Sequence, residues 1–248
     1  MPPRSRRLPF PDHAVTAVLV SHDGAAWLPE CTGALAAQTR PPQRVVAVDT
    51  GSTDGSVDVL TAALGESTVV TRPRTTPFGE AIQAGLEAFA GAPTPPGVTA
   101  GATEWVWVLH DDCAPQPDAL HALLERADAS PSAAVVGPKV VSWDSRRLVE
   151  VGVTIDSSGF RETGLEPREV DQGQHDDIGD VLAVGTAGML VRRDTWDSLG
   201  GLDAAWPLVG DERWFRRPDR GLPFRPGRRS RDHCRSRLSP GRAQSWGR

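Results

Sequence analysis

The chain has 248 residues, 39% of them hydrophobic, which is enough for a buried core in one large domain or two small ones. It contains no run of 18 or more apolar residues, and its basic start, MPPRSRRLPFPDH, lacks the apolar stretch of a secretory signal, so we expect neither a transmembrane segment nor export. The net charge of −5 is uneven: residues 213–248 hold 12 Arg against two acids, about +10, which leaves about −15 on residues 1–212. Such an acidic body argues against nucleic-acid binding, which needs clustered Lys and Arg.

The cysteines are far apart and show no CxxC spacing; they are Cys31, Cys113 and Cys234. An odd number at such spacings predicts free thiols in a reducing compartment rather than a disulfide framework. We therefore expect a cytoplasmic protein. Its basic tail leaves peripheral association with the inner face of a membrane open as an alternative.

The first half of the chain alternates strands and helices. Residues 1–13, with four Pro and three Arg, predict a disordered lead-in. After it, apolar runs predict strands over 14–21, 44–48, 67–72 and 104–109. The intervening segments have helical spacing: one carries Trp27, Leu28, Cys31 and Leu35 on one face, and the others span 56–64, 78–92 and 117–127. This alternation is typical of a right-handed βαβ array with a mainly parallel sheet.

The second half has a different pattern. Residues 133–143 and 147–156 read as extended segments, and residues 157–180 as a long polar loop. Residues 181–203 predict a strand, a turn of small residues, a second strand and a short helix, so we expect mixed or antiparallel strands here. We predict one domain over 14–212 and an irregular, Arg- and Pro-rich tail over 213–248.

Three of the predicted strands end in polar clusters: SHDG after the first, DTGSTDGS after the second and HDDCAP after the fourth. In open α/β sheets, ligands bind outside the carboxyl ends of the strands. The shared location of the three clusters therefore predicts a ligand site at that edge.

The cluster DTGSTDGS, residues 49–56, predicts a nucleoside pocket in which Asp49 accepts hydrogen bonds from a base or ribose. The alternative is a capped strand-to-helix turn with no ligand. Neither GxGxxG nor GxxxxGK[ST] occurs, which argues against dehydrogenases and P-loop NTPases. Arg72 and Arg74 follow the third strand and suit phosphate or base recognition, the alternative being two exposed arginines.

The cluster HDDCAP places Asp111 and Asp112 side by side after a buried strand. Adjacent carboxylates repel unless a cation or hydrogen bonds compensate them, and a hard divalent ion bridging to a diphosphate is the usual solution. The alternative is a solvated pair that caps the next helix. His110 alternates with Asp111 in direction, so we expect it to face the sheet.

Two further acidic clusters are weaker signals. His175 with Asp176 and Asp177 has no second His at helical spacing, so we expect it to be solvated. Asp211 and Glu212 form a second acid pair far along the chain, which on its own is more often surface charge than a general base.

Taken in order, these segments resemble the family 2 glycosyltransferases of the GT-A fold. The resemblance runs from about Val15 to Glu212 and is carried by VTAVLVSHDGAAWLPECTGALAAQTRPPQRVVAVDTGSTDGS, TPFGEAIQAGL, WVWVLHDDCAPQPDALHALL and GTAGMLVRRDTWDSLGGLDAAWPLVGDE. It implies an α/β protein of the GT-A type, the fold of nucleotide-diphospho-sugar transferases. In that fold a mainly parallel central sheet is flanked by helices and accompanied by a mixed smaller sheet.

The resemblance also implies roles for particular residues. Asp49 corresponds to the acid that holds the nucleotide base, and Asp111 and Asp112 to the acids that hold Mg²⁺ or Mn²⁺ on the donor diphosphate. His110 stands where many members have a first Asp, so the metal would rest on two acids, chiefly Asp112. The catalytic base corresponds to Asp211 or Glu212, where members usually have Asp at the second place. We expect the nucleotide-sugar contacts to be Ser21, Asp23, Asp49, Asp54, Arg72 and Asp111.

The implied activity is an inverting, metal-dependent transfer of a sugar from a nucleotide-sugar donor to a hydroxyl acceptor, carbohydrate or lipid-linked. A carboxylate would take the proton of the acceptor hydroxyl for in-line attack at the anomeric carbon. Cell-envelope polysaccharide synthesis is the process we associate with it.

Two alternatives stay open beside this activity. After Glu212 the sequence departs from the family pattern, so we expect a truncated or frame-shifted C-terminus, and the chain would then be an inactive, nucleotide-sugar-binding remnant. Resequencing the locus tests this. The second alternative is a sugar nucleotidylyltransferase, against which the absence of an early GxGTRL-like loop argues.

Overall fold

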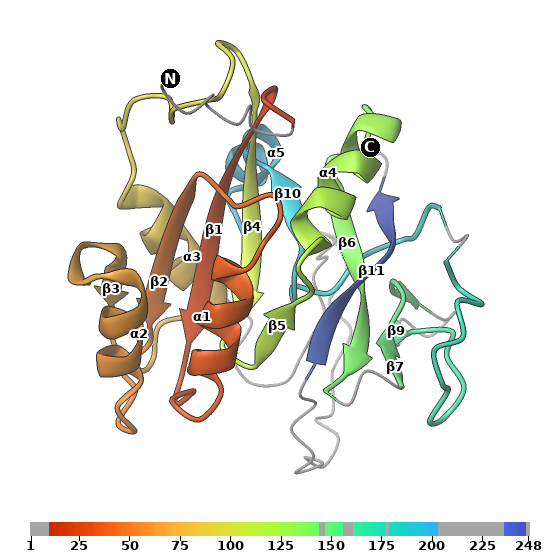
Figure 1. Cartoon of the computed structure of the whole chain (residues 1–248), viewed down its shortest axis with the longest axis horizontal. Helices are drawn as coiled ribbons and strands as arrows, with labels where there is room; N and C mark the ends of the chain where they lie inside the picture. The colour runs from red at the N-terminus through yellow and green to blue at the C-terminus, as the bar shows by residue number, and fades with distance from the viewer. Residues whose placement is uncertain (1–9, 144–146, 156–160, 177–178, 203–235, 247–248) are drawn as a thin grey trace, which may run out of the picture.

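The protein was analysed as a computed structural model that describes residues 10–143, 147–155, 161–176, 179–202 and 236–246. Within these ranges nine strands form one sheet in the order β3-β2-β1-β4-β10-β6-β11-β5, with β7 paired to the side of β6 (Figure 1). Two further strands, β8 and β9, pair only with each other.

The first half forms the parallel part of the sheet. Its elements are β1 (His13–Ser21), α1 (Leu28–Ala36), β2 (Arg44–Asp49), α2 (Ser56–Leu64), the 3₁₀ turn η1 (Glu66–Thr68), β3 (Val69–Thr71), α3 (Phe78–Glu87), β4 (Thr103–His110), β5 (Cys113–Pro115) and α4 (Ala119–Ala129). β1 pairs in parallel with β2 and β4, and β2 with β3, which confirms the predicted βαβ array. The helix predicted over 78–92 ends at Glu87, and Gly91 with φ 73° lies in the turn that follows.

The second half adds antiparallel strands. Its elements are β6 (Val135–Ser142), β7 (Leu148–Glu150), β8 (Thr154–Ile155), β9 (Arg161–Glu162), β10 (Leu190–Arg192), α5 (Arg193–Leu199) and β11 (Ser236–Trp246). β10 lies antiparallel between β4 and β6, so the predicted antiparallel strands join the main sheet, and only β8 and β9 form a smaller one. The strand predicted at the start of 181–203 is reduced to one bridge between Ala183 and Val153.

Each of the two end segments predicted to be irregular contains described residues with regular structure. Phe10 already packs against the core and β1 begins at His13, whose ring bonds to Asp128 and to the Trp105 indole, so order starts before residue 14. Within the tail predicted to be irregular, β11 pairs with β6 and β5. An open sheet edge offers unpaired backbone N–H and C=O groups to any extended segment, so such a strand needs no apolar alternation to mark it in the sequence.

The core lies on both faces of the sheet. Helices α1, α2 and α4 cover one face, and α3 and α5 cover the other (Figure 1). Strand β4 shows why: Trp107 packs on the first face and Val108 on the second, and both are fully buried. A strand covered on both faces requires the continuous apolar run seen in the sequence.

The strand register brings the carboxyl ends of the parallel strands to one edge. Ser21 pairs with Asp49 and Val20 with His110. Strand β10 pairs antiparallel with both β4 and β6, and its Leu190 lies between Trp107 and Val136. Strands β4 and β6 therefore run in the same direction. Three residues further along each strand, Lys139 lies level with His110. Among the described helices, none combines the length and the apolar character needed to cross a bilayer.

Candidate functional site

The loops after β1, β2 and β4 are joined by hydrogen bonds at the carboxyl edge of the sheet. The backbone N–H of His22 donates to Asp111 Oδ2 over 2.7 Å, across 89 residues of sequence. The imidazole Nδ1 of His22 lies 2.9 Å from Thr50 Oγ1, and that hydroxyl donates to the carbonyl of Ser21. The predicted convergence of the three polar clusters is therefore present in the structure.

Asp23 links the same loops through hydrogen bonds at a more exposed position. Its φ of 53° is left-handed, which a non-glycine residue adopts only when its surroundings hold it. Its Oδ1 accepts the Thr53 N–H over 2.8 Å, and its Oδ2 accepts Arg74 Nη2 over 2.6 Å. The Arg74 bond, followed by that of Thr53, lowers the pKa of Asp23 from 3.8 to about 2. Arg74 Nη1 also donates to the Gly51 carbonyl, so this arginine connects the loops after β1, β2 and β3.

Asp49 and Asp54, both predicted to contact the nucleotide, bond within their own loop. Asp49 is buried and accepts the N–H and the hydroxyl of Ser52, over 3.0 and 2.5 Å. Asp54 accepts the hydroxyl of Ser56 and, from the loop after β1, the N–H of Ala25. These bonds do not cap α2, whose N-cap residue Gly55 has no side-chain cap hydrogen bond, but they hold the loop after β2 against the loop after β1.

Asp111 lies at the centre of this arrangement. A Cβ added to Gly24 would overlap the Asp111 carboxylate, so the loop after β1 can approach this acid only with glycine there. Burial raises the pKa of Asp111, the His22 N–H lowers it, and Asp112 raises it again. The net effect is a raised pKa, so ionisation of this carboxylate is less favourable in the protein than in water.

His110 faces away from these acids, as the strand alternation predicted. Its Nε2 lies 3.0 Å from Thr186 Oγ1, and its ring meets Phe78 edge-on at 4.9 Å between centroids. Burial lowers the pKa of His110, although Asp111 acts in the opposite direction, so the neutral imidazole is favoured. Cys113 and Cys31 are buried thiols outside any disulfide, and burial raises the pKa of the Cys31 thiol to about 12.

The donor set of Asp111 and Asp112 fits a hard divalent cation that is shared with a diphosphate. In the described ranges no group of three or more His, Cys, Asp or Glu side chains has a metal-binding arrangement. Mg²⁺ is commonly bound through one or two carboxylates, with water and substrate phosphates completing its shell. A cation between these two acids would also favour the ionised form of Asp111.

The remaining predicted site residues differ in burial and in their distance from the acids, and two of them are not described. Ser21 is fully buried; its hydroxyl forms no hydrogen bond of good geometry in the described residues, yet its proximity slightly lowers the pKa of Asp111. Arg72 donates its backbone N–H to Asp49 and its guanidinium to the neighbouring Thr71 carbonyl, so its side chain does not join the cluster. Asp211 and Glu212 lie outside the described residues.

Two contributors were not predicted as site residues from the sequence. Arg74 was considered with Arg72, and only the structure shows that Arg74 is the one that reaches Asp23. Gly24 carried a signal, because a glycine directly after a polar strand end often marks a close approach of backbone to another group.

The cluster at His175 and Asp176 is not merely solvated, contrary to our expectation. Asp176 and Asp171 both pair with Lys139, the chain's single lysine, at 2.6 and 2.8 Å. His175 lies 2.7 Å from Glu169. These contacts tie the long polar loop to β6 because a buried ammonium group needs acidic partners.

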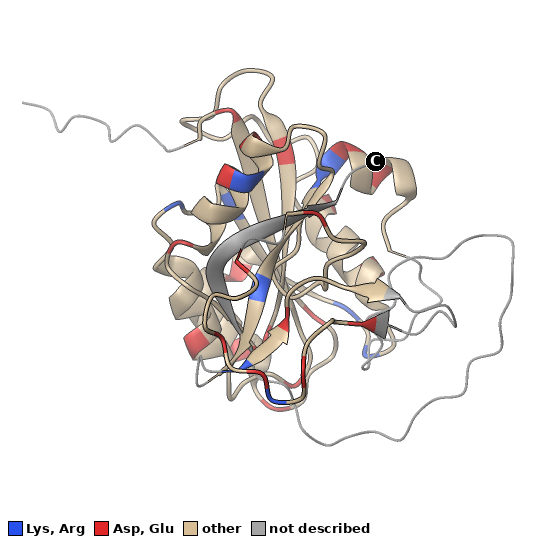
Figure 2. Ribbon diagram, turned by 90° about the vertical axis from the view of Figure 1, so that its right-hand side faces the viewer, with Lys and Arg blue, Asp and Glu red and all other residues tan. Residues whose placement is uncertain are grey.

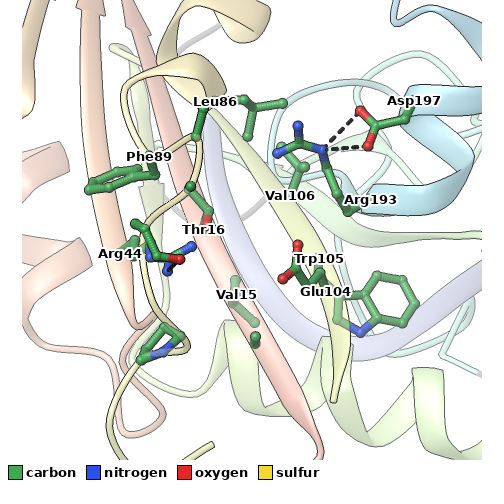
Figure 3. Close-up of a pocket in the computed structure, with 15 residues that line it drawn as sticks. Val15, Thr16, Arg44, Leu86, Phe89, Glu104, Trp105, Val106, Arg193 and Asp197 are labelled. Carbon is green, nitrogen blue, oxygen red and sulfur yellow. Dashed lines mark hydrogen bonds and ion pairs between the residues drawn. The ribbon is translucent and has the colours of Figure 1, made fainter. Parts of the chain in front are cut away.

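A hollow of about 230 Å³ lies at the opposite, amino edge of the sheet (Figure 3). Its charged lining groups have partners nearby: Arg193 bonds to Asp197 one helical turn on, and Arg44 donates to the carbonyls of Ala92 and Pro93. The hollow is therefore distinct from the cluster of acids at the carboxyl edge.

Charged residues on the described part of the chain are interspersed, with acidic positions on many loops and basic positions mostly isolated (Figure 2). This distribution differs from the clustered basic surface that nucleic acids require.

Comparison with known proteins identifies the family. The sequence profile of Glycosyl transferase family 2 matches residues 16–194. The chain belongs to glycosyl transferase family 2. This confirms the family predicted from the sequence. No curated protein sequence matches the chain.

Solved structures are similar to this family 2 chain, and the one with a TM-score above 0.5 confirms the GT-A fold. One is the mannosyltransferase PcManGT from Pyrobaculum calidifontis in complex with GDP-Man and Mn²⁺, with TM-score 0.51 and 16% identity over 80% of this chain and 49% of that one. Another is S. aureus TarS 1–349, with TM-score 0.48 and 14% identity over 79% of this chain and 52% of that one. The chain thus spans about half the length of these structures.

Proposed function

We propose that the chain transfers a sugar from a nucleotide-sugar donor to a hydroxyl acceptor, with inversion and with the help of Mg²⁺ or Mn²⁺. The observation that carries the proposal is the bond from the His22 N–H to Asp111, because it joins the loop after β1 to the acids after β4. The loop after β2 bonds to the same segment through Thr50, and together the loops form a polar edge suited to a nucleotide diphosphate.

Within this site Asp111 and Asp112 would hold the cation, and Asp49, with Ser21, Asp23 and Asp54, would line the nucleotide side. When bound, the cation supplies charge neutralisation for the departing nucleotide diphosphate. Arg74, 53% exposed and already beside Asp23, adds a positive group at the mouth of the same edge. Asp211 or Glu212 is the proposed base that takes the proton of the acceptor hydroxyl.

A single displacement follows from this arrangement of roles. The acceptor oxygen attacks the anomeric carbon as the bond to the diphosphate oxygen breaks, so the configuration at that carbon inverts. We extend the proposal to a carbohydrate or lipid-linked acceptor in cell-envelope polysaccharide synthesis at the cytoplasmic side of the membrane. The mannosyltransferase bound to GDP-Man and Mn²⁺ supports the donor class and the metal by analogy of fold.

Isothermal titration of UDP, GDP and dTDP, with and without Mn²⁺, tests the proposal on the wild type and on Asp112→Ala. We expect one of the nucleotides to bind the wild type in a Mn²⁺-dependent manner and to lose that dependence in Asp112→Ala. Binding without turnover of the corresponding nucleotide sugar would favour the inactive remnant. No binding of any nucleotide would contradict both readings.

A further inference from the structure

The segment of residues 183–188, which we name the strap, crosses one face of the sheet beside the proposed metal site. Its sequence, AVGTAG, consists of small residues. At one end Ala183 bridges to Val153, and at the other the Gly188 N–H donates to the Val108 carbonyl of β4 over 2.9 Å. The strap therefore connects the β7–β8 side of the sheet to the strand that ends in the two acids.

The strap lies directly on β6 between those two ends. A Cβ added to Gly137 of β6 would come within 2.5 Å of the Val184 Cβ. Because real Cβ atoms do not approach so closely, a side chain at Gly137 would lift the strap off the sheet. The close packing of the strap on β6 therefore requires glycine at position 137.

Glu150 holds the middle of the strap. This residue of β7 is only 6% exposed, and its Oε1 accepts the Gly185 N–H over 2.5 Å. A Cβ at Gly185 would meet Oε2 at 2.6 Å, so the contact again requires glycine. A buried carboxylate is costly unless it is hydrogen-bonded, and its bonds to backbone N–H groups are short and strong.

The next residue of the strap reaches His110. Thr186 is 2% exposed, and its hydroxyl lies 3.0 Å from His110 Nε2. Phe78 closes the other side of the same ring. Since His110 directly precedes Asp111 and Asp112, the position of its ring influences the direction in which the two acids leave β4.

We propose that Glu150 is a positioning residue for the metal site, acting through Gly185 and Thr186 on His110 and so on Asp111 and Asp112. This inference rests on the proposed function, because it concerns a cation held by those acids. Groups that bond directly to metal ligands typically change metal affinity about 10–100-fold when they are substituted, and Glu150 and Thr186 would act on the ligands in the same way, one step further away through His110.

The test compares nucleotide affinity with Mn²⁺ and with EDTA, using whichever of UDP, GDP or dTDP the wild type binds best. The ratio of the two affinities is the readout, because a merely structural change would weaken both alike. We expect Glu150→Ala and Thr186→Val to lower the ratio about 10–100-fold. Glu150→Gln and Thr186→Ser, which keep an oxygen at the same place, should restore most of it. Thr154→Val makes the same chemical change at an exposed strand position and should leave the ratio unaltered.

Thr186→Val preserves the shape of the side chain, so it decides the matter even where Glu150→Ala fails to fold. An unchanged ratio in folded Thr186→Val, or no rescue by Thr186→Ser, would overturn this inference alone. If the wild type binds no nucleotide, or binds it equally with EDTA, the proposed metal site fails and the inference fails with it.

Discussion

The two edges of the central sheet are built on the same strands but hold their polar groups in different ways. At the carboxyl edge, Asp111 of the loop after β4 accepts a bond from His22 of the loop after β1, and Asp23 accepts bonds from the loops after β2 and β3. At the amino edge the hollow is open, yet Arg193 pairs with Asp197 of its own helix and Arg44 lies over Phe89 and bonds to loop carbonyls (Figure 3).

The difference shows that a hollow by itself does not locate chemistry. At the carboxyl edge, burial and, to a smaller extent, the neighbouring Asp112 raise the pKa of Asp111, and a bound cation would favour the ionised carboxylate. At the amino edge Arg193 is neutralised by Asp197, and Arg44 donates to backbone carbonyls. Four pairs of substitutions test this contrast, from the largest expected effect to the smallest.

The strongest test uses the two ends of strand β4. Asp112→Ala should reduce sugar transfer about 10³-fold, because loss of a metal ligand removes several kcal/mol of charge stabilisation in the transition state. Glu104→Ala removes an exposed carboxylate at the amino end of the same strand and should leave the rate within about twofold. Initial rates with a radiolabelled donor at saturating Mn²⁺ measure both. Equal losses in the two variants would contradict the assignment of the site to the carboxyl edge.

The second test concerns the loop tied to β6. Lys139→Met leaves Asp171 and Asp176 beside a position with no positive charge, and should lower the free energy of unfolding by about 3 kcal/mol. Arg192→Met breaks an exposed pair with Asp194 and should cost under about 1 kcal/mol. Urea unfolding followed by circular dichroism gives both values. Similar losses in the two variants would mean that burial of Lys139 adds nothing to its pairing.

The third test uses Gly24, in the loop before α1, and Gly33, within α1. Gly24→Ala forces a Cβ against the Asp111 carboxylate and should destabilise the fold by about 1–2 kcal/mol and weaken Mn²⁺-dependent nucleotide binding. Gly33→Ala, within α1, meets nothing within 4 Å and should stabilise by up to about 1 kcal/mol. Thermal unfolding and titration calorimetry separate the two effects. Unimpaired binding in Gly24→Ala would show that the loop is free to move away from Asp111.

The smallest effect is expected from Arg74→Gln. Removing the guanidinium should raise the pKa of Asp23 from about 2 toward its ordinary 3.8, which carboxyl NMR titration would detect. Because the folded-state pKa is depressed, the stability contributed by Asp23 is present above about pH 4 and is lost as the pH falls toward 2. The variant should therefore show a flatter dependence of unfolding midpoint on pH in that window. Arg72→Gln is the matched control, since within the described ranges its guanidinium donates to the neighbouring Thr71 carbonyl and not to Asp23, and an equal shift in it would contradict the pairing.

The sequence by itself predicted the parallel half of the fold and the edge at which its polar clusters meet. The apolar run before Asp111 could only be a strand covered on both faces, and a polar cluster after each of three such strands had to meet at one edge. The motifs in order also predicted the family. These signals are local, or depend only on the order of elements, so they survive without coordinates.

Only the tertiary structure decided which side chains meet. It joined Asp23 to Arg74 rather than to Arg72, placed Gly24 against Asp111, inserted β10 between β4 and β6, and laid the strap across the sheet from Glu150 to His110. Each of these contacts joins segments far apart in the sequence through loops that have no periodic pattern. Periodicity fixes the direction of a side chain within its own element, whereas the distance between two loops depends on the order and register of the strands that carry them.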